Sequence, residues 1–243
     1  MARKINPLGF RLGTTEKHHS VWFEQPKNYC KGLQEDKRIR DCIKNYIDNR
    51  RKKSEPMKNL ITRIQIEKHI EKQIHLTTVI IFMGFQELFE EKPTKRGKKE
   101  DELRHIKELS ELKVNVEKAL DPNLRRNREL KVVIRNILNP FVDPNILAEL
   151  LAHLLKKRIP FRKAMKRVIE LAKKAHTKGV KVQIAGRIDG RDIARVECLL
   201  QGRIPLHTIR AKIDFCSTRV QMRYGVLGIK IWIFSDTDRQ FEK

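Results

Sequence analysis

Residues 160–187 read PFRKAMKRVIELAKKAHTKGVKVQIAGR, and this stretch decides the fold class. Its first part, residues 160–177, repeats apolar residues at helical spacing, so we expect a helix with one buried side. A short β-type run follows over residues 179–187. A helix that leads directly into a strand indicates a domain built from both kinds of element.

The polar side of that predicted helix is almost entirely cationic. At about 100° per residue, six cations fall on one side of the helix, namely Arg162, Lys163, Lys166, Arg167, Lys173 and Lys174. Like charges four residues apart cost a few tenths of a kcal/mol per pair when no partner is bound. A solvated helix face and a membrane-surface helix are the alternatives. We interpret this side as a nucleic-acid face because Glu170 is the only acid in residues 156–178.

A second basic group follows in glycine-containing turns, GRIDGRDIAR at residues 186–195 and Gly-Arg at 202–203. Glycine lets backbone N–H groups approach a phosphate, and an arginine can hold two phosphate oxygens in one plane. Two tight turns with solvated arginines would give the same pattern. Given the surrounding charge, we expect nucleic-acid contacts from Arg187, Arg191, Arg195 and Arg203.

The remaining patterns complete an α+β protein of two domains. Past residue 145 we expect a helix at 145–157 and further strands at 194–200, 207–216 and 228–234, which gives two helices on a four-stranded sheet. Before it we expect helices at 33–51 and 103–120 and strands at 60–67, 74–83 and 129–137. The expected divisions are a basic arm at 1–30, a first domain at 31–138, a hinge at 139–145 and a second domain at 146–243.

The charge of the chain points to a polyanionic partner. Of 243 residues, 54 are Lys or Arg and 30 are Asp or Glu, which gives a formal net charge of +24. Nucleic acid fits this excess better than a membrane, because the apolar runs are too short to span a bilayer. Few aromatic residues lie outside apolar runs, so we expect contacts to the nucleic-acid backbone more than to its bases.

The sequence gives little support to a metal site or an enzyme. The four cysteines have no C-x-x-C pair, and the eight histidines are scattered, so we expect free thiols, no metal and no cofactor. Neither a Ser-His-Asp arrangement nor a P-loop occurs, and we expect no catalytic residues. Dispersed acids such as Asp189 and Asp192 are expected in turns.

Several long blocks of this sequence resemble one protein family. They are MARKINPLGFRLG at 1–13, FRKAMKRVIELA at 161–172, GVKVQIAGRIDGRDIAR at 179–195, GRIPLHTIRAKIDF at 202–215 and YGVLGIKIWIF at 224–234. The chain is similar nearly end to end to the S-three family of the small ribosomal subunit. NPFVDPNILAELLA at 139–152 and VIIFMGF at 79–85 look most like its plastid branch.

The resemblance implies an architecture and a role. It implies a type II KH domain followed by a second α/β domain, in a structural protein of the small-subunit head that has no enzymatic activity. The expected partners are ribosomal RNA, neighbouring head proteins and messenger RNA where it enters its tunnel. The resemblance assigns the tunnel contacts to Arg162, Lys163 and Lys166, with Lys163 standing where Arg is common. Lys4 and Arg11 in the arm are also expected to contact RNA.

The KH loop departs from the family pattern. A KH domain clamps about four nucleotides through a Gly-x-x-Gly loop. The nearest match here is Gly97, Lys98 and Lys99 followed by Glu100, which would repel phosphate, so we expect a docking module in place of a clamp. A free KH-type RNA-binding regulator is the alternative function. Similarity from Met1 onward leads us to expect no transit peptide, with synthesis inside the organelle and location in the chloroplast stroma.

Overall fold

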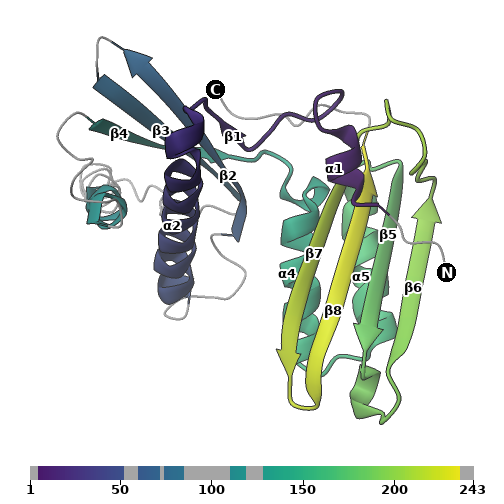
Figure 1. Ribbon diagram of the computed structural model, residues 1–243. Helices are drawn as coiled ribbons and strands as arrows, with labels where there is room; N and C mark the ends of the chain where they lie inside the picture. Colours follow the sequence, from purple (N-terminus) through teal and green to yellow (C-terminus); the bar gives the residue numbers. More distant parts are fainter. Residues whose placement is uncertain (1–4, 52–59, 72–73, 85–109, 119–127, 236–243) are drawn as a thin grey trace, which may run out of the picture. The chain divides into compact units, whose positions relative to one another are not determined.

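The computed structural model describes residues 5–51, 60–71, 74–84, 110–118 and 128–235, and these form two compact units. One unit is His19–Ile137, and the other joins the residues up to His18 with those from Leu138 onward. Each unit contains its own four-stranded sheet (Figure 1). The α+β class expected from the sequence is therefore confirmed.

The sheet of the C-terminal unit is antiparallel throughout, in the order β6-β5-β8-β7. Its strands are β5 (Gly179–Gly186), β6 (Arg195–Gly202), β7 (Ile213–Met222) and β8 (Gly225–Phe234). In β5, the apolar residues Val180, Val182 and Ile184 are buried on one face. This alternation is what a strand with one covered face requires.

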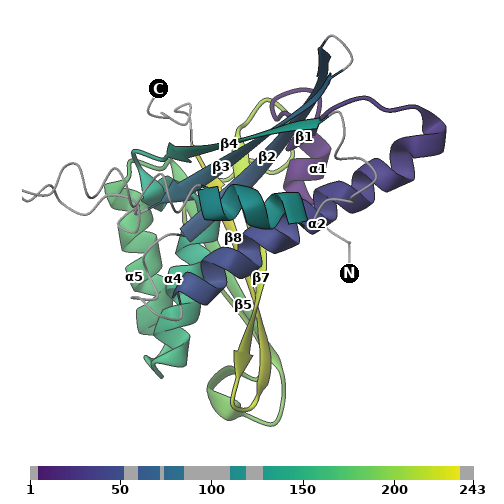
Figure 2. The ribbon, with the colours of Figure 1, turned by 90° about the vertical axis from the view of Figure 1, so that its left-hand side faces the viewer.

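Two helices cover that face of the sheet, as expected. Helix α4 (Pro144–Lys156) contacts β7 and β8, and helix α5 (Phe161–Lys174) contacts β5 and β6. Figures 1 and 2 show both helices on the same side of the strands. Because α4 is apolar on most of its surface, it forms the centre of this core, with Ile146, Leu147 and Leu151 fully buried.

The expected strand at 207–216 is wrong in position, since β7 begins at Ile213 and continues to Met222. The chain before β7 folds across the other face of the sheet instead of joining it. There Ile204 and Leu206 pack against a small core of Ala211, Ile213 and Trp232. Ala211 lies within the predicted range, between Arg210 and Lys212, and packs in this core before β7 begins, so its alternation with polar residues imitates a strand pattern. Helix α1 (Pro7–Arg11) lies on this same face.

The N-terminal unit has a mixed sheet in the order β1-β2-β3-β4. Its strands are β1 (Ser20–Val21), β2 (Leu60–Glu71), β3 (Ile74–Gly84) and β4 (Arg128–Asn136). The central pair β2 and β3 is antiparallel, and the two outer pairs are parallel. Helix α2 (Pro26–Arg51) and the helical residues 110–118 lie on one face (Figure 2), where Ile39, Ile43 and Ile66 are fully buried.

The expected arm at 1–30 differs from the structure at both of its ends. Helix α2 begins at Pro26, seven residues before the predicted start at Leu33, because proline is well suited to a first helical turn. The residues before His19 belong to the C-terminal unit. The expected hinge at 139–145 contains the short helix η2 (Pro140–Val142), and α4 already starts at Pro144.

Candidate nucleic-acid interface

Helix α5 separates apolar and cationic residues as the sequence predicts. Ala164, Met165, Val168, Ile169 and Ala172 are buried. All six predicted cations are exposed: Arg162, Lys163, Lys166, Arg167, Lys173 and Lys174. Within the part of the chain that the structure describes, none of the six forms an ion pair. We call these six side chains the α5 cationic face.

The first turn of α5 adds to this positive charge. It contains no acidic residue, and Pro160 at the N-cap supplies no side-chain hydrogen bond to the helix end. The positive end of the helix dipole therefore coincides with Arg162 and Lys163. Such a combination destabilises the isolated helix slightly and favours an anion close to the helix start.

The predicted cations lie at two opposite ends of the C-terminal unit, as the connection between α5 and β5 shows. Only residues 175–178 separate the two elements, so they run in opposite directions, and the start of α5 lies at the same end of the unit as the end of β5. Arg187 follows β5 at this end, and Arg195 pairs with Gly186 across the sheet. Lys173 and Lys174 lie at the other end. Arg203 lies there too, because it follows Gly202, which pairs with Gly179 at the start of β5.

One arginine of the turn after β5 forms hydrogen bonds within that turn. Arg187 donates from Nε to the carbonyl oxygen of Arg191 at 2.8 Å and from its terminal nitrogen to a carboxylate oxygen of Asp192 at 3.1 Å. Asp189 has a φ of 57°, a left-handed conformation that these contacts help to hold. Arg187 therefore shapes the turn, while Arg191 and Arg195 are exposed beside it. Both acids lie in this turn region, as expected.

Tyr224 is a residue of this region that the sequence did not single out. It lies in the connection between β7 and β8, and its side chain is 58% exposed. A Cβ built on Gly190 would lie 2.9 Å from Cδ2 of Tyr224, so the ring packs directly against that glycine. The contact joins two turns 34 positions apart in the chain, and no local pattern signals it. An exposed ring thus lies beside the basic turn.

Arg11 does not lie on a surface, contrary to the expectation that it contacts RNA. Its side chain is fully buried and donates to the carbonyl oxygens of Pro7, Leu206, Thr208 and Ala211. Burial lowers the pKa of this guanidinium from its ordinary value, and the Glu16 carboxylate opposes the shift. With its donors committed to backbone oxygens, Arg11 has a structural role. Lys4 and the predicted KH-loop residues Gly97, Lys98 and Lys99 lie outside the described residues.

The comparisons with known proteins agree with this geometry. The family model of the ribosomal protein S3 C-terminal domain matches residues 151–233, which include α5 and the C-terminal sheet up to the penultimate residue of β8. The small ribosomal subunit protein uS3c of Crucihimalaya wallichii is 54% identical over 239 residues, covering 98% of this chain and 100% of that protein. The uS3c proteins of Arabidopsis thaliana and Barbarea verna are also 54% identical, over 98% and 97% of this chain.

The chain belongs to the S-three family of small ribosomal subunit proteins. Within that family it is of the plastid type, as its similarity to the uS3c proteins indicates. Members of the S-three family are structural ribosomal proteins without enzymatic activity, so this chain is a structural constituent and not an enzyme. Family membership also favours this function over the free KH-type regulator.

The described residues of the chain offer little for a metal site or a membrane span. Among the residues that the structure describes, no group of three His, Cys, Asp or Glu side chains could hold a metal ion. No helix within the described ranges is long and apolar enough to cross a membrane.

Proposed function

We propose that this chain binds small-subunit ribosomal RNA in the head of the subunit through the α5 cationic face, and that Arg162, Lys163 and Lys166 also contact incoming messenger RNA. The observation that carries the proposal is the α5 cationic face itself, six exposed cations without an ion pair among the described residues. Phosphate oxygens supply the counter-charge that this surface lacks within the described chain.

Neighbouring residues extend the same surface. Lys156, Lys157 and Arg158 are exposed at the end of α4, directly before the start of α5. Burial lowers the pKa of His153, one turn earlier in α4, and the charges of Lys157 and Lys156 lower it further. The lysine contribution to this shift reflects the positive charge at the end of α4. An RNA backbone placed here would relieve repulsion among these side chains.

The proposed contact to messenger RNA requires charge without base recognition, because every message must pass the same surface. Lysine and arginine side chains hold phosphates without regard to sequence. Lys163 is a point charge that cannot form the planar two-point contact of an arginine, so the message is held less rigidly at that position. We therefore assign these residues an electrostatic role: they hold single strands while translocation supplies the work of opening structure.

The N-terminal unit is proposed to be a type II KH domain that serves as a docking module. Support comes from the order of its elements, α2, β2 and β3, then the helical residues 110–118 and β4, with β4 parallel to β3. The proposed loop residues 97–99 precede that helix in sequence. Neighbouring head proteins are the further partners we propose, and the chloroplast stroma is the proposed compartment.

A charge-reversal variant tests this function. The triple change R162E, K163E and K166E is compared with K44E, K113E and K118E, which alter three exposed cations of the N-terminal unit and change the net charge equally. Both variants are assembled into plastid-type small subunits, followed by gradient sedimentation and by translation of messages with and without a 5′ hairpin.

We expect both variants to sediment with the small subunit. We expect only the α5 variant to translate the hairpin message poorly relative to the unstructured one. Equal translation of both messages by the α5 variant would remove the messenger RNA part of the proposal. A wild-type chain that stays outside the small-subunit fraction would remove the whole of it.

A further inference from the structure

The N-terminal unit carries an exposed apolar group next to β1 and the start of α2. Val21, Phe23, Tyr29 and Leu33 are 51%, 87%, 49% and 48% exposed. Tyr29 and Leu33 lie one helical turn apart, and therefore on the same side of α2. Single exposed apolar side chains are ordinary, but four within thirteen residues form a surface that needs an explanation. We call these four side chains the aromatic patch.

The half-buried ring of Trp22 packs against Tyr29 of the aromatic patch, and Trp22 directly precedes Phe23 in the chain. Its ring centroid is 5.3 Å from that of Tyr29. Trp22 donates from Nε1 to Oδ2 of Asp36 at 2.8 Å, which satisfies its one polar group. A Cβ on Gly32 would lie 2.9 Å from the indole, so a glycine in the helix allows this close approach. The indole is therefore held in place beside the exposed ring of Tyr29.

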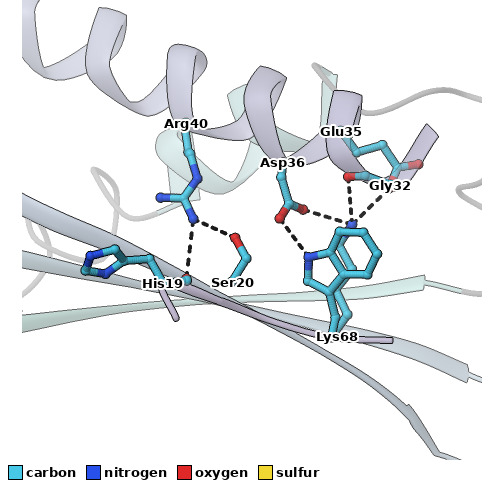
Figure 3. A network of polar contacts seen from close by, with 8 residues as sticks. His19, Ser20, Gly32, Glu35, Asp36, Arg40 and Lys68 are labelled. Carbon is cyan, nitrogen blue, oxygen red and sulfur yellow. Dashed lines mark hydrogen bonds and ion pairs between the residues drawn. The ribbon is translucent and has the colours of Figure 1, made fainter. Parts of the chain in front are cut away.

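A polar network behind the indole keeps this arrangement rigid. The Lys68 ammonium lies 2.9 Å from Asp36 and 3.4 Å from Glu35, and donates to the Gly32 carbonyl oxygen at 3.3 Å. The same ammonium lies 4.6 Å from the centroid of the Trp22 ring. Figure 3 shows Lys68 reaching from the sheet toward these helix residues. The Lys68 ammonium, the two carboxylates and the Trp22 ring therefore hold one another in place.

Arg40 fastens β1 to α2 in the same network. It donates to the Ser20 hydroxyl at 2.8 Å and to the His19 carbonyl oxygen at 3.3 Å, as Figure 3 shows, and to the Ile64 carbonyl oxygen at 2.6 Å. The segment that carries Val21 and Phe23 is therefore anchored immediately before them. A surface that is already ordered loses little conformational entropy when a partner binds.

Apart from the half-buried Glu24, which directly follows Phe23, the charges around the aromatic patch are positive. Both acids in the first half of α2, Glu35 and Asp36, are buried in the Lys68 network. The exposed charged side chains of residues 26–38 are Lys27, Lys31, Lys37 and Arg38. Lysine is depleted in protein–protein interfaces, whereas aromatic rings together with cations are the usual surface for unpaired RNA. The composition thus favours RNA over a protein as the partner.

We propose that the aromatic patch binds unpaired bases of RNA, with bases stacked on Phe23 and Tyr29 and the flanking phosphates held by Lys27 and Lys31. This inference rests on the proposed RNA-binding function and adds a base contact on the N-terminal unit. It goes beyond the sequence-based expectation that the chain contacts the nucleic-acid backbone more than the bases. Stacking is tolerant of sequence because every base has a flat aromatic face.

Binding of two short RNA probes by the full chain tests the inference. The probes are a 12-nucleotide oligoadenylate and an abasic ribose-phosphate strand of the same length and charge. We expect the wild-type chain to bind the oligoadenylate about 10-fold or more tightly than the abasic strand. We expect the double variant F23A and Y29A to bind both probes equally, at the affinity of the wild type for the abasic strand.

A matched control and a spectroscopic signal accompany the affinities. Val114 is 45% exposed on the helical residues 110–118 of the same unit, so V114A removes an exposed apolar group elsewhere and should change neither affinity. The chain has two tryptophans, and Trp232 is only 6% exposed. With W232F, the remaining fluorescence of Trp22 should be quenched by the oligoadenylate and unchanged by the abasic strand. Thermal unfolding of each variant verifies that it is folded.

The outcomes separate this inference from the function on which it rests. Equal wild-type affinity for the two probes, or tight oligoadenylate binding by the double variant, overturns the base contact and leaves phosphate binding by α5 intact. Failure to bind either probe contradicts RNA binding by the free chain as a whole. A double variant with normal RNA binding but poor retention in small subunits would show that the aromatic patch contacts a protein, which also overturns the inference.

Discussion

The Nε atom of Arg11 donates a hydrogen bond of 2.7 Å to the carbonyl oxygen of Ala211, 200 residues further along the chain. Two more carbonyl oxygens of the same segment, from Leu206 and Thr208, accept from the terminal nitrogen at 3.1 and 2.9 Å. The guanidinium therefore joins the N-terminal residues to the segment that precedes β7. A cation in a strongly basic chain serves here as an internal cross-link.

Arg11→Met should destabilise the C-terminal unit by about 3 kcal/mol, because it leaves several buried carbonyl oxygens without a donor. Arg191→Met is the matched control, since Arg191 is exposed, and its effect should stay within about 0.5 kcal/mol. Denaturant unfolding followed by circular dichroism measures both changes. Equal stabilities of the two variants would contradict the structural role of Arg11.

The contrast between Arg11 and α5 explains how much the sequence could predict. The α5 pattern is local, because both its buried and its cationic sides recur within single helical turns, and its segregation was predicted correctly. The burial of Arg11 depends on carbonyl groups nearly two hundred residues away. In sequence, Arg11 is one more cation in a basic segment, so the resemblance to RNA-binding residues was misleading there.

The same limit applies to the elements around β7 and α2. Ala211 alternates with Arg210 and Lys212 as in a strand, but it packs in a small core on a sheet face, which only the tertiary fold decides. The early start of α2 could not be predicted, because Gly32, a poor helix former, is required where the Trp22 ring approaches. The aromatic patch could not be predicted either, because exposure of Phe23 and Tyr29 follows from the network beneath them.

Gly202→Ala should weaken the edge of the C-terminal sheet. Gly202 has a φ of 75°, and an added Cβ would lie 2.2 Å from the Lys178 carbonyl oxygen, a backbone atom that cannot move aside cheaply. We expect a loss of about 2 kcal/mol or more in the free energy of unfolding. Gly9→Ala is the control, since its nearest contact would be an ordinary 3.9 Å. Unfolding of Gly202→Ala at the same denaturant concentration as Gly9→Ala would contradict the close approach of Gly202 to the Lys178 backbone.

Cys216 should make the stability of the chain depend on pH in alkaline solution. Burial raises the pKa of this thiol to about 12, and the carboxylates of Asp143 and Glu149 add to the shift. The unfolded thiol ionises near pH 8.5, so the folded state retains the proton that the unfolded state loses. The free energy of unfolding is therefore unaffected by this thiol below about pH 8.5. Between about pH 8.5 and pH 12 it falls by about 1.4 kcal/mol per pH unit.

Cys216→Ala removes this contribution, so the stability difference between wild type and variant should shrink as the pH rises from 8 to 10. Urea unfolding at several pH values measures it. A difference that stays constant over this range would contradict the raised pKa. Alkylation gives an independent reading, since the exposed thiols of Cys30 and Cys198 should react in the folded chain and Cys216 only after unfolding.

The salt dependence of RNA binding tests the central claim most directly, namely that the α5 cationic face neutralises RNA phosphates. If six cations each displace a counterion, the plot of log affinity against log salt concentration should have a slope of about −4 to −5 for this face alone. The variant R162E, K163E and K166E should reduce the magnitude of the measured slope by about 2 to 3, and K44E, K113E and K118E should change it by less. A slope near zero for the wild type, or one that the α5 variant leaves unchanged, would contradict the claim.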